Sequence, residues 1–160
     1  MLNQDRLQEF YTAVGAAVWH LQFLEDVLVT YVAARLKLGG RGAGKVGLEV
    51  LDEQRQRTLG ELVRDAKSGG ILVGRIEEAF EVLAERNWLI HRSMHEVSDG
   101  LYNDSSREAA ISRVRTLADK SISLKKALYA DCRIWFDAQG VDVHGAEAAG
   151  LARFRELRDA

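Results

Sequence analysis

The segment from Asp5 to Leu38 constrains the fold more than any other part of the sequence. Apolar residues recur there at every third or fourth position, which is the spacing of one face of an α-helix. These residues are Leu7, Phe10, Val14, Val18, Leu21, Leu24, Leu28, Val32 and Leu36. Proline, which usually interrupts helices, is absent from all 160 residues. The pattern predicts one long helix, ended by Gly39-Gly40.

Glycines and polar turns divide the rest of the chain into further helices. Thr58-Leu-Gly-Glu61 has the form of a capping box, which predicts the start of a short helix that ends at Ser68-Gly-Gly70. A third helix is expected from about Val73 to about Val97. After the turn-rich loop 98–103, a fourth helix should begin at Asp104 or Ser105, with Ser105 and Glu108 forming a second capping box.

The fourth helix should run to about Ala138 and bury one apolar face. Its expected inward residues are Ile111, Val114, Leu117, Leu124, Leu128 and Trp135. A last short amphipathic helix is expected around Leu151, Phe154 and Leu157, and no stretch has the alternation of a β-strand. The sequence therefore predicts a single all-α domain over residues 1–160, an up-and-down bundle of four to five helices. The helices at 5–38 and 73–97 should lie antiparallel in its core.

Composition excludes several classes of protein. Apolar residues make up 47% and charged residues 29%, which is typical of a soluble globular chain, and the formal net charge of −2 gives no overall attraction to nucleic acid or to an anionic membrane. The single Cys132 excludes an internal disulfide and a cysteine-built zinc site. The polar start and the shortness of the longest uncharged run, residues 10–24, predict a cytoplasmic protein that does not enter the membrane.

The segment from Gly39 to Lys45 contains most of a phosphate-binding loop, G-x-x-x-x-G-K. That motif requires a buried strand before the loop and a Ser or Thr after the lysine to reach magnesium. Here a long helix precedes the loop and Val46 follows it. We therefore interpret this segment as a connector and not as a nucleotide site.

The third predicted helix carries an unusual set of polar residues. Its apolar face is formed by Ile76, Phe80, Leu83, Ile90 and Met94, and the one missing step of the pattern is Asn87. His91 follows one turn later and Arg86 flanks the same edge. Polar groups at the border of a buried seam cost free energy unless they are satisfied. Either Asn87 fixes the helix register and His91 is a satisfied core residue, or these residues perform chemistry.

The segment Arg86-Asn87-x-x-x-His91 resembles the R-N-x-x-x-H signature of the HEPN superfamily, small helical bundles that include many metal-independent RNases. Residues 19–31 are similar to the helix that opens bacterial members. The likeness covers about the first two thirds of the chain. It implies a homodimer in which two copies of the motif meet across a two-fold axis and form one composite site, with no metal and no cofactor.

Such a site would cleave RNA through the substrate's own 2′-hydroxyl, leaving a 2′,3′-cyclic phosphate. The reaction needs groups that accept and donate a proton, and a histidine, with its unperturbed pKa of ~6.5, suits both roles. Arginine suits the phosphate because its planar guanidinium can bind two oxygens and stays charged. The resemblance thus assigns His91 to proton transfer, Arg86 to the phosphate, and Asn87 to orienting either of them.

Neighbouring residues supply weaker candidates. Glu25 lies at the edge of the first helix's apolar stripe, so we expect it either to pair with Arg86 or to be an ordinary surface carboxylate. Arg92 and His95 lie beside the motif. His91 and His95 have the spacing of a metal-binding pair, but no suitably placed carboxylate completes a metal site.

Two functions from different classes remain open. The first is an RNA-cleaving toxin or phage-defence effector with an antitoxin or operon partner. The tyrosine by which a partner nucleotidyltransferase silences some such toxins is replaced here by Ser93. The second is a non-catalytic helical dimerisation module that binds RNA, a nucleotide or a protein. Seven Lys or Arg against three acids between residues 105 and 136 mark either a phosphate-facing surface or a solvated helix face.

Overall fold

A computed structural model describes residues 4–38, 45–72, 74–142 and 145. Within these ranges every regular element is helical and none is a strand, so the all-α prediction is confirmed. The elements are α1 (Gln4–Val32), the π-helical η1 (Ala33–Leu38), α2 (Lys45–Arg55), α3 (Leu59–Ser68), α4 (Ile76–His91), α5 (Ser93–Val97), the 3-10 helix η2 (Asp99–Tyr102) and α6 (Asp104–Ala138). No helix in the described ranges is long and apolar enough to cross a membrane.

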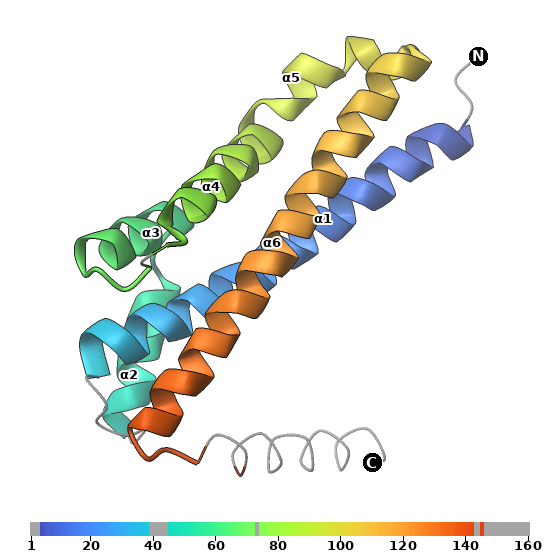
Figure 1. Ribbon diagram of the computed structural model, residues 1–160. Coiled ribbons are helices and arrows are strands. Elements are labelled where there is room, and N and C mark those ends of the chain that lie inside the picture. The colour runs from blue at the N-terminus through green and yellow to red at the C-terminus, as the bar shows by residue number, and fades with distance from the viewer. Residues whose placement is uncertain (1–3, 39–44, 73, 143–144, 146–160) are drawn as a thin grey trace, which may run out of the picture.

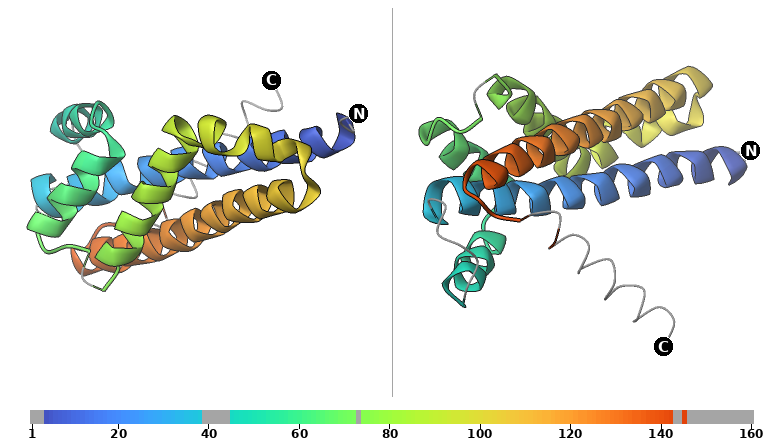
Figure 2. Two further views of the ribbon diagram at one scale, coloured as in Figure 1. Left: turned by 90° about the horizontal axis from the view of Figure 1, so that it is seen from above. Right: turned by 60° about the horizontal axis from the view of Figure 1, so that its bottom comes forward.

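Helices α1 and α6 form the long pair on which the fold is built, and they run parallel, both from the end near α5 to the end near α2 (Figure 1). Their facing sides bury Leu24 and Leu28 from α1, and Val114, Leu117 and Leu128 from α6. Helices α3, α4 and α5 lie along one side of this pair (Figure 2). The sequence had predicted the helix at 73–97 as the second long core helix. That was wrong, because α6 takes this place and α4 ends at His91.

The prediction for the first helix holds to within a residue of its expected start, although its last turns widen into η1. The predicted stop at Gly39-Gly40 lies outside the described residues, as does most of the loop-like segment 39–45. Tyr31 is fully buried near the end of α1 and its hydroxyl donates a hydrogen bond to the carbonyl of Ile71. This bond ties α1 to the connection that leads into α4.

The capping box at the start of α3 is present as predicted. The backbone N–H of Glu61 donates to Thr58 Oγ1 at 3.3 Å, and the Thr58 N–H donates to Glu61 Oε2 at 2.8 Å. The bond from Thr58 lowers the pKa of Glu61, because it stabilises the charged carboxylate. The preceding helix α2 was not expected from the sequence.

The predicted continuous helix at 73–97 was also wrong. Helix α4 ends at His91, Arg92 has a non-helical backbone (φ −125°, ψ −23°), and α5 begins at Ser93. The Ser93 hydroxyl donates to the Leu89 carbonyl at 2.6 Å. Across the break, Trp88 Nε1 donates to Glu96 Oε2 at 2.6 Å. Side-chain hydrogen bonds of this kind compete with the backbone bonds that would continue a helix.

The inward face of α4 differs from the predicted seam. Its buried residues are Ala79, Val82, Trp88 and Leu89. Asn87 is exposed, and the side chains of Ile90 and Met94 are 49% and 79% exposed. The first part of the predicted seam packs against the core, where Ile76, Phe80 and Leu83 are half-buried, whereas the last turn buries Trp88 and Leu89 in place of Ile90. The interpretation of Asn87 as a buried residue that fixes helix register is therefore wrong for the single chain.

Helix α6 has the predicted bounds and buries five of the six predicted inward residues, whereas Trp135 is half-buried. Its N-cap is Asn103, and not Asp104 or Ser105 as expected. The Asn103 side chain accepts hydrogen bonds from the N–H groups of Ser105 and Ser106, so the predicted Ser105–Glu108 capping box does not form. The last predicted helix, around residues 151–157, lies outside the described residues.

Candidate functional site

The motif residues occupy the last two turns of α4. Asn87 and His91 are exposed, one turn apart, and Arg86 is half-buried beside them. Arg86 Nη1 donates a hydrogen bond to Asn87 Oδ1 at 3.3 Å. We call Arg86, Asn87 and His91 the motif strip, in which the guanidinium is half-buried and the amide and the imidazole are exposed.

Glu25 of α1 lies next to this strip, which is the first of the two alternatives that the sequence left open. Its Oε1 is 3.7 Å from Arg86 Nε, a distance that allows an ion pair but no good hydrogen bond. Partial burial raises the pKa of Glu25, and the positive charge of Arg86 opposes this rise. The Glu25–Arg86 contact is therefore loose, and it leaves most of the guanidinium's five N–H donors for another acceptor.

Apolar surface adjoins the motif strip. Ile90 and Met94 are exposed on α4 and α5, and Met94 also lines a groove of about 380 Å³ between α1 and the α5–η2 segment. The α1 wall of the groove includes Tyr11, which is 59% exposed, and η2 contributes Tyr102, which is 73% exposed. Exposed apolar residues that cluster beside polar ones are typical of a protein–protein interface.

The opposite side of α4 carries a second, tighter cluster that the sequence did not reveal. Arg113 of α6 donates two hydrogen bonds to Glu85, at 2.7 and 3.0 Å, and its guanidinium carbon lies 3.6 Å from the ring centroid of Trp88. The hydrogen bonds from Arg113 lower the pKa of Glu85, and the same bonds raise the pKa of Arg113. We call Glu85, Trp88, Glu96 and Arg113 the support cluster.

The other two weaker candidates, Arg92 and His95, are exposed and do not join the motif strip. Arg92 forms the break after α4, and its side chain is exposed. The break places His95 on a different helix from His91, so the two do not form a pair on one helical face. Within the described ranges, no three His, Cys, Asp or Glu side chains are grouped as a metal site would require.

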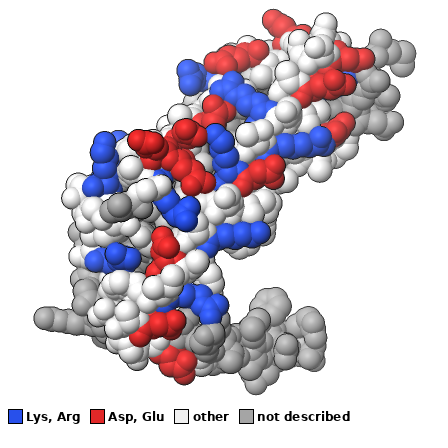
Figure 3. Space-filling model, in the orientation of Figure 1, with Lys and Arg blue, Asp and Glu red and all other residues white. Residues whose placement is uncertain are grey.

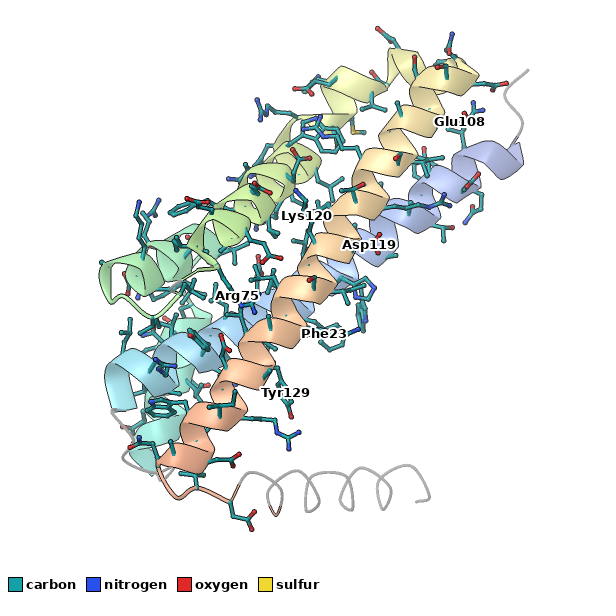
Figure 4. All side chains as sticks on the ribbon, viewed as in Figure 1. Phe23, Arg75, Glu108, Asp119, Lys120 and Tyr129 are labelled. Carbon is teal, nitrogen blue, oxygen red and sulfur yellow. The ribbon has the colours of Figure 1, made fainter. Side chains whose placement is uncertain are left out.

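The basic residues of α6 are largely paired with acids. Arg113 binds Glu85, Arg115 binds Glu9 at 2.8 Å, and Lys120 binds Glu81 at 2.8 Å. Lys120 and Phe23 lie on opposite sides of α6 (Figure 4), and Lys125 stacks over Phe23 at 5.2 Å. Positive and negative side chains are interspersed over the face shown in Figure 3. These contacts favour the solvated helix face over a continuous phosphate-binding surface.

Cys132, the one cysteine of the chain, is buried. Burial raises the pKa of its thiol to about 11, so at neutral pH it is protonated and a poor nucleophile. The motif strip is therefore the better candidate for chemistry.

Comparisons of the chain with protein-family models, with curated proteins and with solved structures gave no match in any of the three.

Proposed function

We propose that this protein is a metal-independent endoribonuclease of the HEPN type, with a composite active site formed across a homodimer. The main observation in favour of this proposal is the arrangement of the motif strip. Arg86, Asn87 and His91 stand together at the end of α4, with Asn87 and His91 open to solvent, and exposed apolar residues lie beside them. The likeness to the R-N-x-x-x-H signature supports the same reading.

In the proposed reaction the 2′-hydroxyl of the RNA attacks the adjacent phosphorus and the bond to the 5′-oxygen breaks. One histidine accepts the hydroxyl proton, and another group donates a proton to the leaving oxygen, which gives a 2′,3′-cyclic phosphate and a 5′-hydroxyl. Arg86 binds the non-bridging oxygens and stabilises the charge of the transition state. Asn87, which already accepts a hydrogen bond from Arg86, holds the guanidinium in place.

A second copy of the chain supplies what one copy lacks. The strip contains a single imidazole, His91, whereas the reaction needs both an acceptor and a donor of protons. Ile90 and Met94 are 49% and 79% exposed next to it, and pairing with a second copy would bury them. A two-fold axis beside the strip would bring two His91 side chains to one phosphate, on the order of 10 Å apart or less.

The biological setting that we propose is a toxin or a phage-defence effector in the cytoplasm, restrained by an antitoxin or operon partner. The alternative is a non-catalytic dimerisation module that binds RNA, a nucleotide or a protein. The paired basic residues of α6 and the net charge of −2 favour this alternative, because they leave little surface for non-specific RNA binding.

Cleavage of a panel of structured and single-stranded RNAs tests the proposal. We expect the wild type to cut in the presence of EDTA and to leave cyclic phosphate ends. His91→Ala should lower the rate by ~10²–10⁴. His95 is an exposed histidine of α5, and His95→Ala should change the rate little. Activity that survives His91→Ala unchanged would contradict the proposal.

Substitutions of Arg86 test the proposal independently. Arg86→Ala and Arg86→Lys should both fail to cut, since lysine keeps the charge but cannot bind two oxygens with one planar group. Circular dichroism and sedimentation should show both variants folded and dimeric. A fully active Arg86→Lys would show that charge alone suffices and would remove the bidentate role.

A further inference from the structure

A hydrogen bond spans the break that follows the motif. Trp88 of α4 is buried, and its indole N–H donates to the Glu96 carboxylate of α5 at 2.6 Å. The two residues are eight positions apart, which in an unbroken α-helix is a rise of about 12 Å. Both side chains would then lean toward the same end of the helix and could not meet. The Trp88–Glu96 bond can therefore form only when the helix is broken between them.

The face of the indole is held as well. Arg113 lies 3.6 Å from the ring centroid of Trp88, and two hydrogen bonds to Glu85 fix the guanidinium in turn. Because contacts from α6 and α4 fix the ring, the indole cannot move together with Glu96. The bond thus fixes α5 relative to α4, and not merely one side chain relative to another.

The break lies directly after His91. Arg92 has non-helical backbone angles, and Ser93 turns its hydroxyl back to the Leu89 carbonyl. His91 is therefore the last residue of α4, and the direction of the chain from Arg92 onward sets which residues border it on its C-terminal side. Without the break, residues 93–97 would rejoin α4 and place His95 one turn above His91 on the same face.

We propose that Glu96 is a positioning residue for His91. By accepting the hydrogen bond from the Trp88 indole, Glu96 holds the helix break, and the break in turn positions the imidazole. The consequence for RNA cleavage rests on the function proposed above, whereas the position of His91 can be measured without RNA. Arg113 and Glu85 complete the support by fixing the ring.

Nuclear magnetic resonance of the full-length protein measures the position directly. The indole N–H signal of Trp88 is assigned by its loss in Trp88→Phe, and the His91 Cε1–H signal by its loss in His91→Ala. In Glu96→Ala we expect the Trp88 indole signal to move upfield and the His91 signal to shift. In Glu96→Gln both should stay close to wild type, because the amide oxygen still accepts the bond. Glu108→Ala, which removes an exposed carboxylate near the start of α6 (Figure 4), is the matched control and should move neither.

RNA cleavage by the same variants gives the second readout. Glu96→Ala should lower kcat on the order of tenfold or more with KM little changed, because a misplaced proton-transfer group affects the chemical step and not binding. Glu96→Gln should recover most of the rate. Trp88→Phe, which keeps an aromatic ring but removes the N–H donor, should match Glu96→Ala in both the His91 signal and the rate.

A His91 signal that stays at its wild-type position in Glu96→Ala, while the Trp88 indole signal moves, would overturn the proposal. Should Glu96→Ala fail to fold by circular dichroism, the comparison of Glu96→Gln with Trp88→Phe decides in its place, by the same His91 signal. A wild type that leaves all RNAs intact would end the proposed function, and the resonance comparison would still decide whether Glu96 positions His91.

Discussion

Helix α4 takes part in one arginine–glutamate pair on each of its two sides, and the two pairs differ in geometry. Toward α1, Arg86 stands 3.7 Å from Glu25, and burial raises the pKa of that carboxyl. Toward α6, Arg113 makes two hydrogen bonds to Glu85 at 2.7 and 3.0 Å, and these lower the pKa of that carboxyl. Glu85 and Arg86 are neighbours in the sequence, yet one belongs to a closed structural pair and the other to an open one.

The difference separates support from function. A guanidinium whose Nε and Nη2 are bound to one carboxylate and whose face lies against an indole has less left to offer a ligand, and its removal disturbs the fold. A guanidinium with one long ion pair and one hydrogen bond, to Asn87, keeps donors free to bind a phosphate. We therefore expect replacement of Arg86 to act on cleavage with little effect on stability, and replacement of Arg113 to lower stability first.

The largest effect is expected at Arg86. Arg86→Ala should lower the rate of RNA cleavage by at least ~10²-fold, the scale of losing one group that stabilises transition-state charge. Its free energy of unfolding should change by less than about 1 kcal/mol, because the Glu25 pair is partly exposed and loose. Single-turnover cleavage and urea unfolding of the same preparation measure the two quantities. A large loss of stability would show that Arg86 is part of the support instead.

The next effect concerns assembly. Replacing exposed Ile90 or Met94 by glutamate should weaken the homodimer on the order of tenfold to a hundredfold, because each places a charge in the proposed interface. Ile134→Glu is the matched control, since Ile134 is 68% exposed near the far end of α6. Sedimentation over a range of concentrations measures the dissociation constants. Equal weakening by all three variants would locate the interface elsewhere.

Arg113→Ala, unlike Arg86→Ala, should show its largest effect on stability. It removes two hydrogen bonds to Glu85 and the cation over Trp88, so we expect the free energy of unfolding to fall by about 1–2 kcal/mol. Thermal or urea unfolding followed by circular dichroism checks the loss. A variant as stable as the wild type would show that the support cluster contributes less than its geometry indicates.

The smallest expected effect is on the pH dependence of stability, to which Glu85 and Glu25 should contribute with opposite signs. Glu85 has a lowered folded-state pKa, so its contribution to stability is present above the unfolded pKa and is lost as the pH falls through the folded value. Glu25 has a raised folded-state pKa. The folded state thus binds its proton more tightly, and stability falls as the pH rises from the unfolded value through the folded one.

Substitution by glutamine removes each titration. As the pH rises through the acidic range, Glu85→Gln should lose stability relative to the wild type, and Glu25→Gln should gain it. Urea unfolding at a series of pH values compares the three proteins. Shifts of the same sign in both variants would contradict the contrast drawn between the two pairs.

Local sequence patterns were sufficient to predict the structure where the interacting residues are close in the chain. The Thr58–Glu61 capping box could be read directly because its partners are three residues apart, and the periodicity of α1 and α6 fixed their lengths. Asn103 was overlooked as a cap because Asp104 and Ser105 are equally good capping residues by type. Choosing among adjacent candidates requires the backbone geometry.

Contacts across the fold were harder to infer. Glu25 was placed near Arg86 because it borders an apolar stripe that must face other helices. Arg113 could not be assigned to Glu85 and Trp88, because 28 residues separate it from Glu85 and no local pattern joins them. The break at Arg92 was missed for the same reason, since the Trp88–Glu96 bond and the clamp from α6 favour it against an unbroken apolar rhythm.

If one copy of the chain holds half of an active site, as we propose, RNA cleavage must depend on the homodimer. The most direct test measures the rate of RNA cleavage per chain as the protein is diluted through its dimer dissociation constant, which sedimentation determines in the same buffer. We expect the rate per chain to fall in proportion to the fraction of dimer, and to recover when the protein is concentrated again. A rate per chain that stays constant into the monomeric range, or a stable dimer that cuts none of the RNAs, would contradict the claim.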